Sequence, residues 1–166
     1  MTELSLDYAL VTPADRPAIL KLEERAFGPG RFAKTAYRLR EGVEPDWSLS
    51  FLARIGGMLV GANTMTRIGI GGAPALLLGP LTVEEAFRAR GVGETLAQKS
   101  LQAARDAGHG LVILVGDPPL YERLGFSRAP FGNFHFPGPV DPGRILYCEL
   151  QPGALQGQKG VVTSGG

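Results

Sequence analysis

Cysteine and histidine are nearly absent from the 166 residues: Cys148 is the only cysteine, and His109 and His135 are the only histidines. A single cysteine excludes an internal disulfide bond and fits a reducing compartment, so we expect a cytoplasmic protein. One cysteine and two distant histidines argue against a zinc site, and we expect no metal. Cys148 lies in the alternating segment RILYCEL, which predicts a buried thiol in a strand.

Excess charge and long apolar runs are missing as well. The formal net charge is +1, so the chain has no broad basic field that would hold nucleic acid or an anionic membrane. The apolar runs are too short to span a bilayer. The N-terminus MTELSLDYAL lacks the charged and apolar regions of a signal peptide. We therefore expect neither a nucleic-acid nor a membrane partner.

Glycine and proline, with 24 and 13 residues, are plentiful but dispersed, so they separate many short elements. The length and a hydrophobic content of 44% predict one domain over residues 1–166, because no repeat or linker divides the chain. The tail, residues 152–166, is expected either as a loop with a short edge strand or as a frayed end.

The hydrophobic pattern predicts the order of elements. Residues 4–12 alternate as a strand, and Thr12 and Pro13 begin a helix that ends at Gly28, with Ile19, Leu22 and Phe27 on one face. The remaining expected elements are a short helix (34–41), a hairpin (47–70) turning at Gly56 and Gly57, a strand (73–83), a helix (93–107), a strand (110–116), a short helix (118–124) and a strand (144–150).

This order predicts an α/β (α+β) fold with one mixed central sheet covered by helices on both faces. The segments LLLGPL, GETLAQKSLQAAR and LVILV form a strand, a helix and a strand, which predicts a right-handed parallel crossover. The hairpin before them adds antiparallel strands to the same sheet.

The stretch RARGVG, residues 88–93, joins a strand to the start of a helix. Gly91 and Gly93 leave the backbone open to a ligand, and the first N–H groups and the dipole of a helix favour phosphate. Arg88 and Arg90 would add charge-assisted bonds to the same anion. The alternative is a tight turn with solvated arginines. A P-loop motif is absent, and Leu96 stands where a dinucleotide fingerprint has its third glycine.

Arg88, Gly91 and Gly93 match the R/Q-x-x-G-x-G/A motif of the GNAT superfamily of N-acetyltransferases. The segment LLLGPLTV resembles that family's fourth strand. LVILVGDPPLYERLGF resembles its fifth strand and the following helix, which ends in Y-x-x-x-G-F, here Tyr121, Gly125 and Phe126. Over residues 4–160 the chain resembles a subgroup of small bacterial predicted acetyltransferases, which also continue into a PGAL segment.

The resemblance implies an acetyl-CoA site and a GNAT-type fold, in which a β-bulge splays the two parallel strands. The strand at Leu81, Thr82 and Val83 would bind the pantetheine arm. Glu94 stands where the family often has a small hydroxylic residue, and we expect its carboxylate to point away from a phosphate. Backbone N–H groups would wrap the pyrophosphate, from Arg88, Ala89, Arg90, Gly91, Val92 and Gly93.

Tyr121 is the candidate catalytic residue. A thiol titrates near ~8.5 and a phenol near ~10, so a tyrosine can give the departing thiolate its proton, and a strand N–H near Val83 would stabilise the oxyanion. Asp117 is expected to cap the helix that follows it. The aromatic segment FGNFHF is expected to pack in the core or the acceptor pocket. The general base stays open among Glu24, Glu84, Glu85, His135 and a water chain.

The expected reaction transfers the acetyl group of acetyl-CoA to a primary amine by direct attack in a ternary complex. A non-catalytic acyl-CoA-binding sensor on the same fold is the alternative, and a module that binds another nucleotide is a third hypothesis. The acceptor would be a small-molecule or peptide amine. A homodimer is possible, because the late strand and the tail would either pair with a second subunit or cover the sheet edge.

Overall fold

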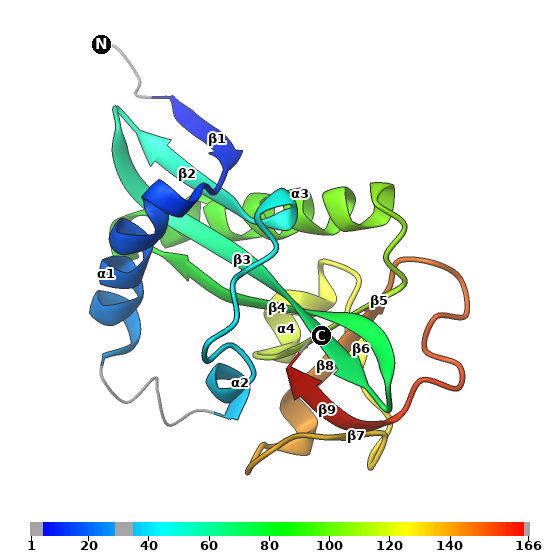
Figure 1. Cartoon of the computed structure of the whole chain (residues 1–166). Coiled ribbons are helices and arrows are strands. Elements are labelled where there is room, and N and C mark those ends of the chain that lie inside the picture. The colour runs from blue at the N-terminus through cyan, green and yellow to red at the C-terminus, as the bar shows by residue number, and fades with distance from the viewer. Residues whose placement is uncertain (1–4, 29–34, 165–166) are drawn as a thin grey trace.

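The computed structural model describes residues 5–28 and 35–164 (Figure 1). The predicted elements occur in the predicted order, with short strands β6 and β7 in addition; Lys34, where the second helix was expected to begin, lies outside the described residues. The helices are α1 (Arg16–Phe27), α2 (Thr35–Arg38), α3 (Val92–Asp106) and α4 (Pro118–Glu122). The strands are β1 (Leu6–Leu10), β2 (Phe51–Ile55), β3 (Met58–Ile70), β4 (Ala73–Val83), β5 (Leu111–Val115), β6 (Ser127–Arg128), β7 (Phe134–His135), β8 (Ile145–Glu149) and β9 (Gly160–Ser164).

The strands form one mixed sheet in the order β1-β2-β3-β4-β5-β8-β6, in which β4 and β5 are parallel. The tail supplies a short strand, but not an edge strand as expected, because β9 lies between the end of β3 and β7 and pairs with both. The hairpin of β2 and β3 turns at Gly56 and Gly57, whose φ angles of 55° and 85° need glycine. These pairings confirm the predicted mixed sheet.

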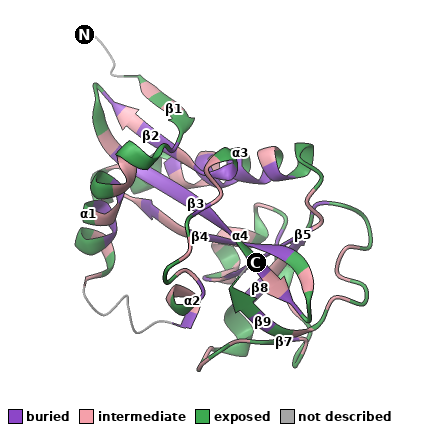
Figure 2. Cartoon of the chain, in the orientation of Figure 1, coloured by how far each residue is buried: buried purple, intermediate pink, exposed green. Residues whose placement is uncertain are grey.

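Helices cover both faces of this sheet, as predicted. On one face Ala97, Leu101 and Ala104 of α3 pack against side chains of β4, β5 and β8. On the other face Ile19 of α1 packs against β2 and β3, and Leu39, just after α2, packs against β3, β4 and β5. Figure 2 shows the buried residues running along the central strands and the inner side of α3.

A β-bulge lies in the middle of β4. Asn63 of β3 pairs with Leu81, but Met65 pairs with Leu78, so Gly79 and Pro80 together stand opposite one residue. Among the described residues, β5 pairs with β4 only at Leu76 and Leu77. The parallel pair therefore separates at the bulge and leaves an open edge along the second half of β4, which is the splayed arrangement that the resemblance implies.

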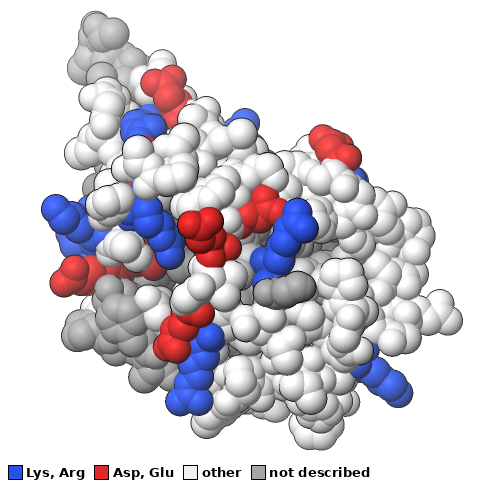
Figure 3. Space-filling view, viewed as in Figure 1, with Lys and Arg blue, Asp and Glu red and all other residues white. Residues whose placement is uncertain are grey.

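The helices within the described residues are all too short or too polar to cross a bilayer. On the face shown in Figure 3, basic and acidic side chains lie intermixed over the α1 side, while much of the rest of this face carries few charges. Cys148 is buried on β8, as its alternating segment predicts.

Candidate active site

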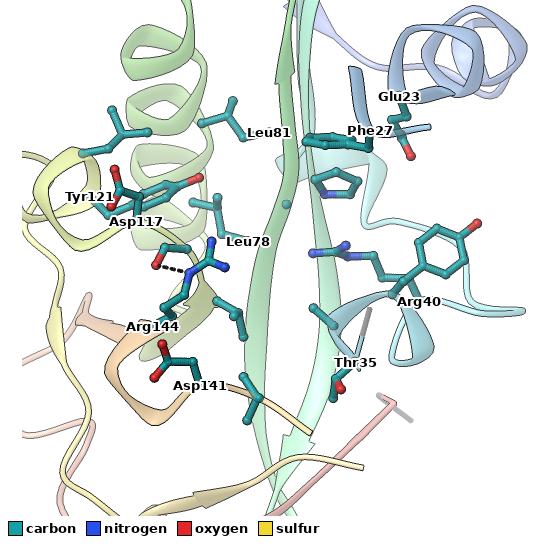
Figure 4. Close-up of a pocket in the computed structure, with 18 of the residues that line it drawn as sticks. Glu23, Phe27, Thr35, Arg40, Leu78, Leu81, Asp117, Tyr121, Asp141 and Arg144 are labelled. Carbon is teal, nitrogen blue, oxygen red and sulfur yellow. Dashed lines mark hydrogen bonds between the residues drawn. The ribbon is translucent and has the colours of Figure 1, made fainter. Parts of the chain in front are cut away.

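A cavity of about 490 Å³ lies where β4 separates from β5. One wall comes from the end of β5, from α4 and from the 3₁₀ turn Pro142–Arg144; the other comes from α1 and the α2 segment (Figure 4). The β4 residues from Leu78 to Leu81, which include the bulge, lie between the two walls. The charged and phenolic side chains that line the cavity are Glu23, Tyr37, Arg40, Asp117, Tyr121, Asp141 and Arg144.

Tyr121 is held in this cavity by close packing. Its ring meets Phe126 edge to face, with centroids 5.9 Å apart and planes at 70°. A β-carbon at Gly116 would come within 2.6 Å of the Tyr121 ring. The ring can therefore occupy this position only because residue 116 has no side chain. In Figure 4 the phenol oxygen points across the cavity toward β4. The predicted catalytic residue therefore faces the open edge of the sheet.

Two guanidinium groups influence the Tyr121 phenol. Burial raises the pKa of Tyr121 above its usual value, and the positive charges of Arg40 and Arg144 oppose part of that rise. The Nε of Arg144 donates a hydrogen bond of 3.2 Å to the carbonyl oxygen of Gly116, which fixes this arginine on the α4 wall. The phenol therefore stays protonated at neutral pH and can act as a proton donor.

Arg40 enters the cavity from the opposite wall. Burial lowers the pKa of Arg40 to about 10, with the charges of Glu23 and Tyr121 acting in the other direction, so the guanidinium is charged at neutral pH. Its Nη2 lies so close to Gly79 that a β-carbon there would sit 3.0 Å away. Arg40 therefore reaches the β4 bulge itself. Sequence reasoning missed it, because nothing in its local pattern marks it.

The carboxylate on the α1 wall belongs to Glu23, and not to Glu24, which is one of the candidates for the general base that the sequence leaves open. Glu23 is 3% exposed and lines the cavity, whereas Glu24 is exposed and does not line it. Helical spacing provides a signal for this, since Glu23 stands four residues after the buried Ile19. Phe27, expected on the core face, is 41% exposed and lines the cavity.

The predicted phosphate loop lies at the far end of β4. Residues Glu85–Arg90 form a 3₁₀ helix, and Gly91, with φ of 74°, turns the chain into α3. A β-carbon at Gly93 would meet Val83 at an ordinary 3.5 Å, so this helix start packs on the strand end. Val92 is fully buried in the core, which leaves only its backbone for a ligand. The first N–H groups of α3 have no partner within the helix.

The charged side chains of this loop already contact protein groups. The Nε of Arg88 donates a 3.2 Å hydrogen bond to the carbonyl oxygen of Val83, and Arg90 lies 5.4 Å above the Phe87 ring. Glu94 forms an ion pair of 2.6 Å with Arg123, which follows α4. This pair directs the Glu94 carboxylate toward α4.

Three other candidates for the general base lie outside the cavity, and Asp117 does not have the capping role expected of it. Glu84 forms an ion pair with Arg25 of α1, Glu85 is exposed on the 3₁₀ helix, and His135 is exposed on β7; none of the three lines the cavity. Asp117 holds the N-cap position of α4, but its side chain makes no capping hydrogen bond and instead lines the cavity, so the expected capping role is wrong.

The aromatic segment FGNFHF divides between core and surface. Phe134 is buried in the cluster below β3, β4 and β5, with Phe136 packed against it, whereas Phe131 is 90% exposed. The expected packing is therefore wrong for Phe131. In the part of the chain that the structure describes, no three His, Cys, Asp or Glu side chains gather as metal ligands would.

The geometry agrees with comparisons with known proteins. The profile of the Acetyltransferase (GNAT) family matches residues 16–126. The uncharacterized N-acetyltransferase YhbS of Escherichia coli (strain K12) is 29% identical over 153 residues, covering 90% of each chain. A crystal structure of Escherichia coli YhbS in complex with CoA superposes with a TM-score of 0.82 at 26% identity, covering 99% of this chain and 92% of that chain.

More distant structures share the fold. The ribosomal-protein-S18-alanine N-acetyltransferase from Escherichia coli has a TM-score of 0.61 at 18% identity, covering 89% of this chain and 95% of that one. Because the family profile matches more than half of the sequence and the splayed sheet is the family's own fold, this chain belongs to the GNAT family and is an N-acetyltransferase.

Proposed function

We propose that the protein transfers the acetyl group of acetyl-CoA to a primary amine by direct attack in a ternary complex. The observation that carries this proposal is the cavity at the separation of β4 and β5, with the Tyr121 phenol turned toward the edge of β4 (Figure 4). A relative of similar fold, YhbS of Escherichia coli, has been crystallised with CoA.

In this proposal the cofactor follows the open edge of β4. Backbone groups of Leu81, Thr82 and Val83 bind the pantetheine arm, because β5 no longer pairs with β4 there within the described residues. N–H groups between Arg88 and Glu94 surround the pyrophosphate, where the start of α3 favours negative charge. The acetyl thioester then enters the cavity between Leu81 and Tyr121, both of which line it.

The transfer requires three proton movements. The neutral amine attacks the thioester carbonyl, a backbone N–H near the end of β4 stabilises the oxyanion, and Tyr121 gives its proton to the CoA thiolate as the carbon–sulfur bond breaks. The attacking nitrogen loses a proton as the amide forms, and this proton returns to the Tyr121 phenolate. The acceptor ammonium must lose a proton before it attacks. Glu23 is the buried carboxylate among the described residues that line the cavity, and we assign this proton to it or to water that it orders.

Calorimetric titration with acetyl-CoA, CoA and ADP tests this function on a matched pair of variants. Gly91→Glu places a carboxylate at the phosphate loop, and Gly157→Glu makes the same change in the tail. The two glycines have similar φ angles, 74° and 78°, and neither has a neighbour within 4 Å of an added β-carbon. We expect CoA binding to be lost only in Gly91→Glu. Failure of the unchanged protein to bind CoA would overturn the proposal.

A further inference from the structure

Arg40 is a half-buried charged group that the proposed reaction leaves unused. Its Nε is buried and has no hydrogen-bond partner among the described residues. Among the described residues it is the one buried cationic nitrogen in this condition. A charged donor held away from water without a partner is costly, so such groups are typical of places where a ligand completes the bonding.

The position of Arg40 separates it from the phosphates of the cofactor. The guanidinium reaches Gly79 at the bulge in the middle of β4, on the wall built by α1 and α2, whereas the phosphate loop follows the C-terminal end of β4. In Figure 4 Arg40 and Tyr121 lie on opposite sides of β4 and both extend toward it. Each also influences the ionisation of the other. A group bound by Arg40 is therefore close to the site of acetyl transfer and belongs to the acceptor.

The cavity presents charges of both signs. Glu23, Asp117 and Asp141 are acidic, while Arg40 and Arg144 are basic. Arg144 already bonds the Gly116 carbonyl, and Asp141 already accepts from the backbone N–H of Gly143. A polyamine would bring a second cation toward Arg40, which is unfavourable. A molecule with one ammonium and one carboxylate finds a complementary partner for each.

We propose that Arg40 binds a carboxylate of the acceptor, so that the acceptor is a free amino acid or a similar small amino carboxylate. This inference rests on the proposed function and narrows its acceptor. A peptide N-terminus offers a neutral amide where a free amino acid offers a carboxylate, and a guanidinium binds the carboxylate more strongly. Apolar residues in the same cavity, Phe27, Leu78 and Val140, would contact an apolar side chain.

Matched acceptor pairs test this inference through release of CoA thiol from acetyl-CoA. Leucine is compared with leucinamide and phenylalanine with phenylalaninamide, in the unchanged protein, Arg40→Gln and Arg38→Gln. Arg38 is an exposed arginine two residues away that does not line the cavity, which makes it the control. The ratio of kcat/KM between acid and amide should fall about 10- to 100-fold in Arg40→Gln, the factor of one charge-assisted hydrogen bond, and stay unchanged in Arg38→Gln. Comparing ratios between variants cancels the different basicities of the two amines.

A second readout does not require turnover. With CoA present, N-acetylleucine should raise the melting temperature of the unchanged protein and of Arg38→Gln more than N-acetylleucinamide does, and Arg40→Gln should lose that difference. Equal shifts for acid and amide in the unchanged protein would overturn the inference while CoA binding still supported the proposed function. An unchanged acid-to-amide ratio in Arg40→Gln would overturn it as well. Absence of CoA binding would remove both proposals together.

Discussion

The two sides of the opening between β4 and β5 differ in the groups that line them and in how those groups are distributed along the sequence. The side that we assign to the cofactor is one continuous stretch, from Leu81 to Glu94, and it offers mainly backbone groups at a strand edge and a helix start. The acceptor side gathers side chains from α1, the α2 segment, α4 and the 3₁₀ turn before β8. This contrast suggests that backbone geometry binds the ligand common to the family, while side chains from distant segments select the individual acceptor.

The largest effect should come from removing one hydroxyl group on the acceptor side. Tyr121→Phe keeps the ring that packs on Phe126 but removes the proton donor. We expect kcat to fall by about 100- to 10,000-fold, the usual contribution of general acid catalysis, while calorimetric CoA affinity stays the same. Loss of CoA affinity in this variant would show that the two sides are not separate in function.

Equal substitutions at two glycines should affect the two sides unequally. A methyl at Gly116 would lie 2.6 Å from the Tyr121 ring, whereas a methyl at Gly93 would meet Val83 at 3.5 Å. Gly116→Ala should therefore displace the phenol and lower kcat on the order of 100-fold, as misplacement of a reacting group does. Gly93→Ala should retain most of the activity. Steady-state kinetics of both variants, with CoA titration as a control for folding, checks this prediction.

The pH dependence of kcat should report the environment of the phenol. Tyr121 must be protonated to donate, and burial raises its pKa, so the group remains competent as the pH rises through the usual titration range of tyrosine. We expect kcat to decline only above about pH 10, by roughly tenfold per unit. A decline that begins below pH 9 in the unchanged protein would contradict this assignment.

The same contrast explains what the sequence could predict. The phosphate loop and the bulged strand are local patterns, so Arg88, Gly91 and Gly93 could be identified from their spacing. Arg40 could not, because its role depends on α2 packing beside a strand that begins more than thirty residues later. Local patterns do not encode such distant contacts.

Glu23 lies between these two cases, since helical periodicity predicts which side of α1 is buried but does not predict the cavity. The spacing from Ile19 places Glu23 on the buried side of α1 and leaves Glu24 in solvent. Phe27 stands four residues after Glu23 and lines the same cavity, although its hydrophobicity predicts a core position. The sequence thus predicts in part which residues of a helix face inward. It does not predict that they border a cavity, because the cavity results from tertiary packing.

A smaller effect is expected for an arginine side chain on the cofactor side. The Arg88 guanidinium is exposed, and its Nε already bonds the carbonyl of Val83, so it adds little to the backbone groups beside it. Arg88→Ala should weaken CoA binding by about 3- to 10-fold, and less at high salt, because exposed charges are screened. Complete loss of binding would mean that the side chain, rather than the backbone, holds the pyrophosphate.

The smallest effect is expected for Glu94→Gln, which should strengthen CoA binding rather than weaken it. Its ion pair with Arg123 is largely exposed, with side-chain exposures of 34% and 65%, so its loss should lower the melting temperature by about 2 °C or less. Glu94→Gln also removes a negative charge from the start of α3, where we place the pyrophosphate. CoA should then bind about twofold more tightly at low salt, while the control Glu122→Gln on α4 should not change the affinity. Weaker CoA binding in Glu94→Gln would instead indicate that the ion pair fixes the relative positions of α3 and α4 and so shapes the cofactor side through a side chain.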